Sequence, residues 1–218
     1  MSPTLAELER AAQDVIMIMK NVPELASQKV AVIGGLALWK YMPKGRSTED
    51  VDFMISVDGP KSVKPKLLAM KNSRFVERAQ YFYYKAAYFP PTAVAIKSIE
   101  PGTVPYISVD DLIVFKIFSC GLRSEVTKSK RDALDAYRLL DQRTATEGPM
   151  HLAKHQVDVV LPGLADVVKH TTQDDKWWKM RLGLGAGSSS PSSSKHGTTP
   201  SGPSSRGSGS RPSARKAR

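Results

Sequence analysis

The stretch Lys29-Val-Ala-Val-Ile33, continued by Gly34-Gly35 and Leu36-Ala-Leu-Trp-Lys-Tyr41, decides the fold of this chain. Its first part is a short apolar run that predicts a strand, and its last part has helical composition. The two glycines between them mark a tight turn. Because glycine lacks a Cβ atom, the backbone there can approach an oxyanion closely, and a helix start attracts anions. The stretch predicts an α/β fold with a turn able to hold phosphate.

The Gly34-Gly35 pair alone is compatible with two interpretations. It lacks the third spaced glycine of the dinucleotide-binding pattern and the Gly-Lys-Ser/Thr ending of the phosphate loop. A strand that ends in two glycines is also often a tight turn and nothing more. A phosphate site at this turn therefore needs support from residues elsewhere in the sequence.

The segments on either side alternate between helices and strands. Thr4-Leu-Ala-Glu7 is a capping-box pattern, which predicts a helix as far as Lys20. The other elements expected before residue 108 are a strand at 51–57, a lysine-rich helix at about 60–71 and strands at 81–89 and 92–99. We therefore expect a mixed sheet flanked by helices.

From residue 108 onward the chain is predicted to be helical. Ser108-Val-Asp-Asp111 is a second capping box, and it opens an apolar helix that runs through Phe118. Further helices are expected at 124–140, 150–160, 163–170 and 173–182. The predicted organisation is an α/β core at 1–107, a helical subdomain packed on it at 108–185, and a tail at 186–218.

Much of the positive charge belongs to the tail. The formal net charge is +11 at pH 7, and residues 186–218 hold six basic residues and no acidic residue. Serine, glycine and proline dominate this segment, which has too few apolar side chains to offset the entropy of ordering its backbone. We expect it to be disordered. Its last basic residues could contact phosphates or act as a nuclear address, although such ends are mostly solvated.

Composition excludes several classes of protein. The longest apolar run without charge, Val30 to Trp39, is about half of the roughly 18 residues that a membrane-spanning helix needs. The single cysteine, Cys120, excludes an internal disulfide framework and a cysteine-based zinc site. We expect a cytoplasmic protein with no membrane partner, or a nuclear one if the tail acts as an address. Any chemical site must rely on carboxylates.

Two carboxylates follow the glycine turn in the segment Asp50-Val-Asp52-Phe53. Residues two apart on a strand project from one face, so Asp50 and Asp52 would point together, and like charges that close repel unless a cation lies between them. Magnesium prefers such oxygen ligands and also binds substrate phosphates. The alternative is an exposed strand with two solvated acids. Alternation with apolar Val51, Phe53 and Ile55 favours the site.

The order of these motifs resembles the signature of the nucleotidyltransferase superfamily, which includes DNA polymerase beta and the minimal nucleotidyltransferases. Most similar are the abortive-infection toxin-like nucleotidyltransferases, in which a Gly-Gly or Gly-Ser turn precedes an Arg-x-Ser/Thr-x-Asp-hydrophobic-Asp strand. Here that strand is Arg46-Ser-Thr-Glu-Asp-Val-Asp-Phe53. Later helices of the family carry a lysine and a basic-Asp-x-x-Asp segment, which match Lys116 and Lys130-Arg-Asp132-Ala-Leu-Asp135. The resemblance spans residues 28–142.

The resemblance implies an α/β nucleotidyltransferase-like fold and a magnesium-dependent, ATP-type nucleotide site. Gly34 and Gly35 would cradle the triphosphate of a nucleoside triphosphate. Asp50 and Asp52 would hold one or two Mg²⁺ ions and act in catalysis. The reaction would move a nucleotidyl group to an acceptor, either RNA or a protein hydroxyl.

Three more residues receive implied roles from the resemblance. Lys116 would neutralise phosphate charge, and Asp132 would orient a base, a sugar or the acceptor. Arg46 would reach a phosphate or form a salt bridge with Asp50. No motif specifies the base, the acceptor, the oligomeric state or an antitoxin-like partner.

One position departs from the family pattern. Active members generally supply a third carboxylate from a later strand, but the strand predicted at 92–99 has Lys97 at the expected place and Glu100 at its end. A lysine beside Asp50 and Asp52 would act as a counterion in place of a metal. A catalytically inactive nucleotide- or RNA-binding protein on the same fold is therefore the alternative. A purely structural module would follow if the two aspartates lay far from the glycine turn.

Overall fold

Within the described part of the chain, three short strands form a sheet in the order β2-β1-β3. The central strand is β1 (Lys29–Ile33), and β2 (Asp52–Ile55) and β3 (Val94–Ala95) both pair with it antiparallel. Residues 30–32 are fully buried, as their apolar sequence predicts. The helix α3 (Gly34–Tyr41) begins directly after β1, so the predicted strand, glycine pair and helix are confirmed.

The structure is a computed structural model that describes residues 2–57, 65, 67–68 and 88–185. The helix expected at about 60–71 and the strand expected at 81–89 lie largely outside the described residues, and the tail at 186–218 lies wholly outside them. The described residues belong to one compact unit, Met1–Ala186.

The sheet differs from the expected mixed sheet in two respects. Its strands are antiparallel, and the parallel contact described for β1 is a single bridge between Val32 and Tyr106. The strand expected at 92–99 is reduced to β3, after which the chain forms the 3-10 turn η2 (Ile96–Ser98). The preceding prolines, Pro90 and Pro91, have no N–H group for a ladder, and β1 itself begins at the level of β3.

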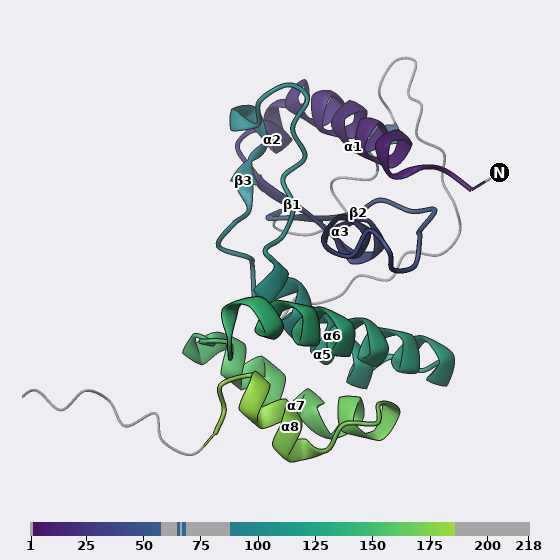
Figure 1. The fold of residues 1–218 in the computed structure, drawn as a ribbon. Helices are drawn as coiled ribbons and strands as arrows, with labels where there is room; N and C mark the ends of the chain where they lie inside the picture. The colour runs from purple at the N-terminus through teal and green to yellow at the C-terminus, as the bar shows by residue number, and fades with distance from the viewer. Residues whose placement is uncertain (1, 58–64, 66, 69–87, 186–218) are drawn as a thin grey trace, which may run out of the picture. The chain divides into compact units, whose positions relative to one another are not determined.

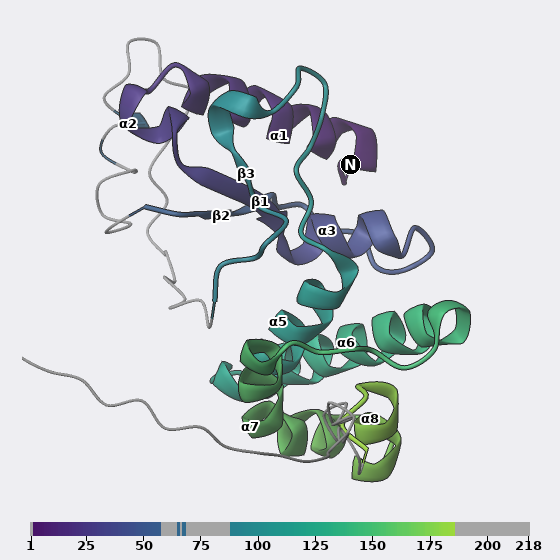
Figure 2. The same cartoon turned by 90° about the vertical axis from the view of Figure 1, so that its left-hand side faces the viewer.

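The helix α1 (Leu5–Lys20) covers one face of the sheet (Figure 2). Its capping box is confirmed, because the Glu7 N–H donates to Thr4 Oγ1 and the Thr4 N–H donates to the Glu7 carboxylate. Alternate residues of β1 project to opposite faces, so Val30 and Val32 pack with α1 while Ala31 joins the core on the other side. A short helix, α2 (Pro23–Ala26), connects α1 to β1.

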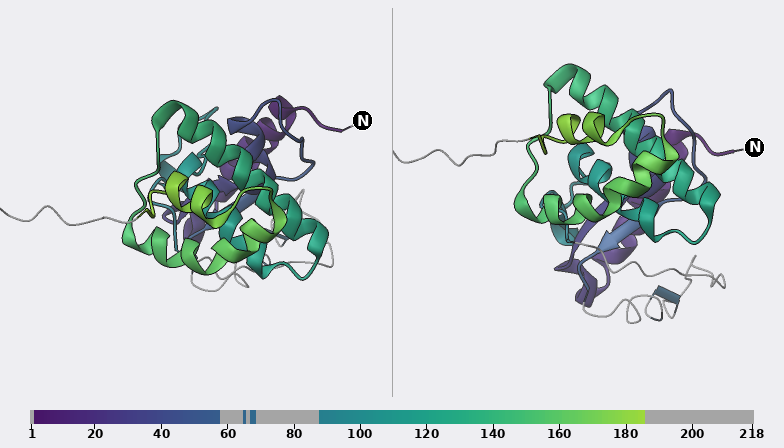
Figure 3. Two further views of the ribbon diagram at one scale, coloured as in Figure 1. Left: turned by 60° about the horizontal axis from the view of Figure 1, so that its bottom comes forward. Right: turned by 90° about the horizontal axis from the view of Figure 1, so that it is seen from below.

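The second half is helical, as expected, and its helices lie together below the sheet in Figure 1. They are α5 (Val109–Leu122), α6 (Val126–Glu147), α7 (Lys154–His170) and α8 (Asp175–Arg181). Ser108 caps α5, as expected, because its Oγ accepts from the Asp111 N–H. The capping box is only partly formed, since the Asp111 carboxylate accepts from the Ser108 hydroxyl and not from the Ser108 backbone N–H. Figure 3 shows α6, α7 and α8, green to yellow, in front of the purple strands and helices of the first half.

The two helices expected at 150–160 and 163–170 form one helix, α7, with Pro162 inside it. Packing against α5 holds this helix together across the proline. A Cβ atom on Gly163 would lie 2.9 Å from the carbonyl oxygen of Ile117, so the glycine permits a close approach of the two helices. Tertiary packing therefore overrides the local signal of the proline.

The apolar core between these helices includes Trp178, which is fully buried, and Cys120, the only cysteine of the chain. Burial, with Asp166 and Asp132 nearby, raises the pKa of the Cys120 thiol to about 11. None of the described helices combines the length and the hydropathy needed to span a bilayer.

Candidate functional site

The end of β1 brings Gly34 against Asp52. The β1–β2 register pairs Ile33 with Asp52, so the carboxylate lies beside the first residue of α3. Gly34 has a φ of +67°, a left-handed conformation that favours glycine, and a Cβ atom there would overlap Oδ2 of Asp52. The backbone N–H of Gly35 donates to Asp52. Asp52 therefore adjoins the glycine turn, so the separation of aspartate and glycine turn that would favour a purely structural module is not found.

The segment before β2 contacts both the glycine turn and helix α6. Thr48 lies on Gly35, since a Cβ atom on this glycine would be 2.5 Å from Thr48 Oγ1. The Asp50 N–H donates to that hydroxyl at 3.3 Å. Arg46, two residues before Thr48, reaches helix α6 and contacts Asp135. Alternate positions of the segment thus link the glycine turn, the carboxylates and the helical half.

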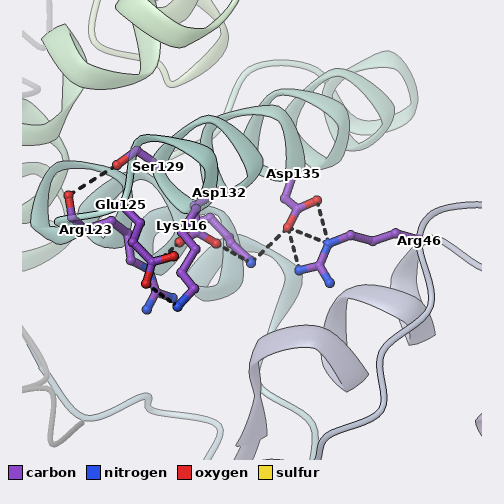
Figure 4. A network of polar contacts seen from close by, with 8 residues as sticks. Arg46, Lys116, Arg123, Glu125, Ser129, Asp132 and Asp135 are labelled. Carbon is purple, nitrogen blue, oxygen red and sulfur yellow. Dashed lines mark hydrogen bonds and ion pairs between the residues drawn. The ribbon is translucent and has the colours of Figure 1, made fainter.

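A buried ion-pair network lies between α5 and α6 (Figure 4). The Lys116 ammonium contacts Asp132 Oδ1 at 2.7 Å and Asp135 Oδ2 at 2.9 Å. All three side chains are at least nine-tenths buried. Lys116 is thus enclosed by carboxylates, whereas the resemblance implies that it neutralises phosphate charge.

Two arginines extend the network to the surface. Arg123 Nε contacts Asp132 Oδ2 at 2.9 Å, and Arg46 holds Asp135 through Nε at 3.2 Å and Nη2 at 2.9 Å. Both arginine side chains are 30% exposed. Arg46 pairs with Asp135 in this arrangement, and the alternative pair with Asp50 is not formed.

The charges around this site shift the pKa values of its carboxyl groups. Desolvation by the surrounding protein, and next the charge of Asp50, raise the pKa of Asp52, against the Gly35 N–H and the cations Lys116 and Arg123. Burial also acts to raise the pKa of Asp132, but Lys116 and Arg123 outweigh it and lower that pKa. Asp132 is therefore stabilised as an anion, whereas the negative charge of Asp52 is disfavoured only moderately, because this residue is exposed and solvent screens the charge.

The carboxylates of Asp50 and Asp52 fit a hard divalent cation. The charge of Asp50 acts to raise the pKa of Asp52, and a cation bound beside the two carboxylates would remove this unfavourable interaction. Within the described part of the chain, no group of three or more His, Cys, Asp or Glu side chains is placed to hold a metal. An ion bound here would take its remaining ligands from water and from substrate phosphates, as Mg²⁺ commonly does.

Lys97 lies away from these aspartates, so its expected place beside them is wrong. β3 pairs with Lys29 at the start of β1, whereas Asp52 pairs with Ile33 at the end of that strand. Lys97 follows β3 in the η2 turn, where its side chain is exposed, and Glu100 lies still farther along. The sequence misplaces Lys97 because it does not show that the strand ends after two residues.

Three residues without a role in the sequence analysis belong to the site: Thr48, Arg123 and Asp135. A signal exists for Asp135, since residues three apart on a helix lie on one face and Asp132 precedes it by three. Thr48 precedes Asp50 by two residues, so an extended segment directs both to one side. Nothing in the local sequence indicates that Arg46 would select Asp135.

Replacing Asp52 by asparagine should stabilise the fold at neutral pH when divalent cations are absent. The folded-state pKa of Asp52 is raised, so its favourable contribution is complete below the unfolded-state pKa and is lost as the pH rises through the folded-state value. Asparagine still accepts from the Gly35 N–H but carries no charge. Thermal unfolding in chelator should show Asp52→Asn gaining on wild type from acid to neutral pH.

The matched control is Asp158→Asn, which changes an exposed carboxylate on α7. Its melting temperature relative to wild type should vary little across the same pH range. An Asp52→Asn protein that is less stable than wild type at neutral pH would contradict the electrostatic reasoning.

Comparisons of the chain with protein-family models, with curated proteins and with solved structures found no match. The geometry of the site therefore carries the functional argument.

Proposed function

We propose that this chain is a Mg²⁺-dependent nucleotidyltransferase that moves a nucleotidyl group from a nucleoside triphosphate to an acceptor hydroxyl, on a nucleotidyltransferase-like fold. One observation carries the proposal: the Asp52 carboxylate, two residues after Asp50 in the chain, lies against the glycine start of α3, and its pKa is raised by desolvation and by the charge of Asp50. A carboxylate pair beside a helix N-terminus suits a metal ion and the phosphates it binds.

Each part of the site has a place in this proposal. Asp50 and Asp52 would hold the metal, which when bound supplies charge neutralisation and alignment of the triphosphate. The N-terminus of α3 at Gly34-Gly35 would face the phosphates. Lys116 would not contact the phosphates, because its ammonium is buried and paired with Asp132 and Asp135.

The second candidate function is nucleotide binding without catalysis. It is favoured by the absence, among the described residues, of a third carboxylate that could join Asp50 and Asp52 at a metal. Nucleotidyl transfer also needs the acceptor hydroxyl to be deprotonated and aligned. The other argument for this function, a lysine that replaces the metal, is weakened by the position of Lys97.

Helix α6 offers a reason to favour RNA over protein as the acceptor. Arg131 and Arg138 lie four residues before and three residues after Asp135, so all three share one face of the helix. Both arginines are exposed, on the side of α6 that meets Arg46. Such cations contact a phosphate backbone, and the contact weakens as salt increases.

Incubation with each α-labelled nucleoside triphosphate, Mg²⁺ and total RNA or protein tests the proposal. Wild type should label an acceptor, and Asp52→Asn should lower the rate by about 100-fold or more, since loss of metal binding removes several kcal/mol of charge stabilisation. The control Asp158→Asn should match wild type. An RNA acceptor predicts a strong fall in labelling with increasing salt.

The remaining outcomes separate the two candidate functions. Metal-dependent nucleotide binding that Asp52→Asn removes, without label transfer to any acceptor, would favour the binding protein. Nucleotide binding that is undetectable with and without Mg²⁺ would contradict both.

A further inference from the structure

The segment that carries the two carboxylates is held at both of its ends. At one end, Asp52 is fixed by the Gly35 N–H and by the β1–β2 register. At the other end, Arg46 holds Asp135, a residue 89 positions away in the sequence, through two guanidinium nitrogens. Thr48 and Asp50 lie between these two attachments. The Arg46 pair therefore fixes how the segment enters the site.

We propose that Arg46 is a positioning residue, which sets the geometry of Asp50 and Asp52 for a divalent cation by fastening their segment to helix α6 through Asp135. This inference rests on the proposed function for the existence of the metal site. It assigns Arg46 an action through other residues, in place of the phosphate contact or the salt bridge with Asp50 that the resemblance implies.

Asp135 is a suitable anchor for this purpose. Its side chain is 3% exposed and is itself held by Lys116, which is held in turn by Asp132. It lies within the 22-residue helix α6, which packs along α5. A planar guanidinium that meets a fixed carboxylate through two nitrogens is restricted in direction as well as in distance. Movement of residue 46 therefore requires breaking a partly buried pair.

Electrostatics and positioning predict opposite results when Arg46 is neutralised. A positive charge near a cation site repels the bound ion, so its removal alone would strengthen metal binding. Loss of the attachment would instead loosen the segment of Asp50 and weaken binding, as removal of residues that orient metal ligands commonly does by about 10- to 100-fold. The direction of the change in affinity therefore distinguishes the two effects.

The experiment measures the dissociation constant for Mn²⁺, used as a spectroscopically visible divalent cation, by titration followed with electron paramagnetic resonance. Wild type, Asp52→Asn, Arg46→Met and Arg46→Lys are compared at a temperature where circular dichroism shows each to be folded. Arg46→Met should weaken Mn²⁺ binding by about 10-fold or more. Arg46→Lys keeps the charge but loses the paired geometry, so it should also weaken binding.

The matched control is Arg143→Met. Arg143 lies on α6 and, like Arg46, meets a carboxylate through two nitrogens, with Nε 3.0 Å from Asp110 Oδ1, but it has no link to the Asp50 segment. This change should lower stability and leave the Mn²⁺ dissociation constant unchanged. It separates a general loss of stability from a specific loss of positioning.

Two results would overturn the inference, and they differ in what else they overturn. If Asp52→Asn abolishes Mn²⁺ binding while both Arg46 variants bind as tightly as wild type or more tightly, Arg46 does not position the site and the proposed function stands. If wild type shows no Mn²⁺ binding that Asp52→Asn removes, the inference and the proposed function fail together. Should Arg46→Met not fold, the result with Arg46→Lys decides.

Discussion

Replacing Lys116 by methionine should lower the free energy of unfolding by about 3–5 kcal/mol, the usual cost of leaving a buried charge without its partner. The Lys116 ammonium lies 2.7 Å from Asp132 and 2.9 Å from Asp135, and both carboxylates are almost fully buried. Methionine fills a similar volume but carries no charge, so two neighbouring anions would remain inside the protein. Urea unfolding of wild type and variant measures the difference.

Lys128→Met is the control for this substitution. Lys128 contacts Glu125 at 2.7 Å on the surface of the same helical pair, where both side chains are exposed. Such an ion pair contributes at most about 1 kcal/mol. A loss of less than about 1 kcal/mol for Lys116→Met, equal to that of the control, would show that the buried network does not stabilise the fold.

Replacing Gly34 by alanine should lower stability by about 2–5 kcal/mol and abolish divalent-cation binding. The backbone at Gly34 is left-handed, which costs a residue with a side chain about 1–2 kcal/mol. The new methyl group would also overlap Oδ2 of Asp52, and this overpacking adds about 1–3 kcal/mol. Unfolding in urea and titration with Mn²⁺ measure the two effects separately.

Gly102→Ala provides the comparison, because Gly102 has a φ of +80° but no atom within 4 Å of the position of a new Cβ. It should lose only the conformational part, about 1–2 kcal/mol, and should bind Mn²⁺ as wild type does. Equal losses for the two glycines, with Mn²⁺ binding intact in both, would show that Asp52 is free to move away.

The parts of the fold that the sequence predicts are those with strong local signals. The capping box at Thr4 and the N-cap at Ser108 satisfy backbone N–H groups within one turn, so their effect does not depend on the rest of the chain. The apolar run of β1 and the glycines after it are equally local. These features place the start of α3 and α5 and the centre of the sheet.

The features that the sequence does not predict depend on partners far along the chain. β3 is short because β1 begins beside it, and α7 continues through Pro162 because Gly163 packs closely on α5. The position of Lys97 depends on where β3 ends. A predicted strand that is a few residues too long therefore places Lys97 wrongly beside the aspartates. Such outcomes are set by tertiary contacts, which local patterns do not encode.

The candidate site divides in the same way. The spacing of Asp50 and Asp52 predicts that they act as a pair, and the structure brings Asp52 to the glycine turn. The enclosure of Lys116 by two carboxylates is not predicted, because a lysine on a helix is equally compatible with solvent, phosphate or an ion pair. The ion pair between Arg46 and Asp135 joins residues 89 positions apart in the sequence, so it can be seen only when β2 and α6 are placed in space.

The burial of Cys120 makes its thiol insensitive to oxidants while the helical half stays packed. The thiolate is the form that reacts, and with a pKa of about 11 very little of it exists at neutral pH. The side chain is also 2% exposed, so reagents reach it only when α5 separates from its neighbours. Because it is the only thiol of the chain, a thiol reagent labels only those molecules in which the core around Cys120 has opened.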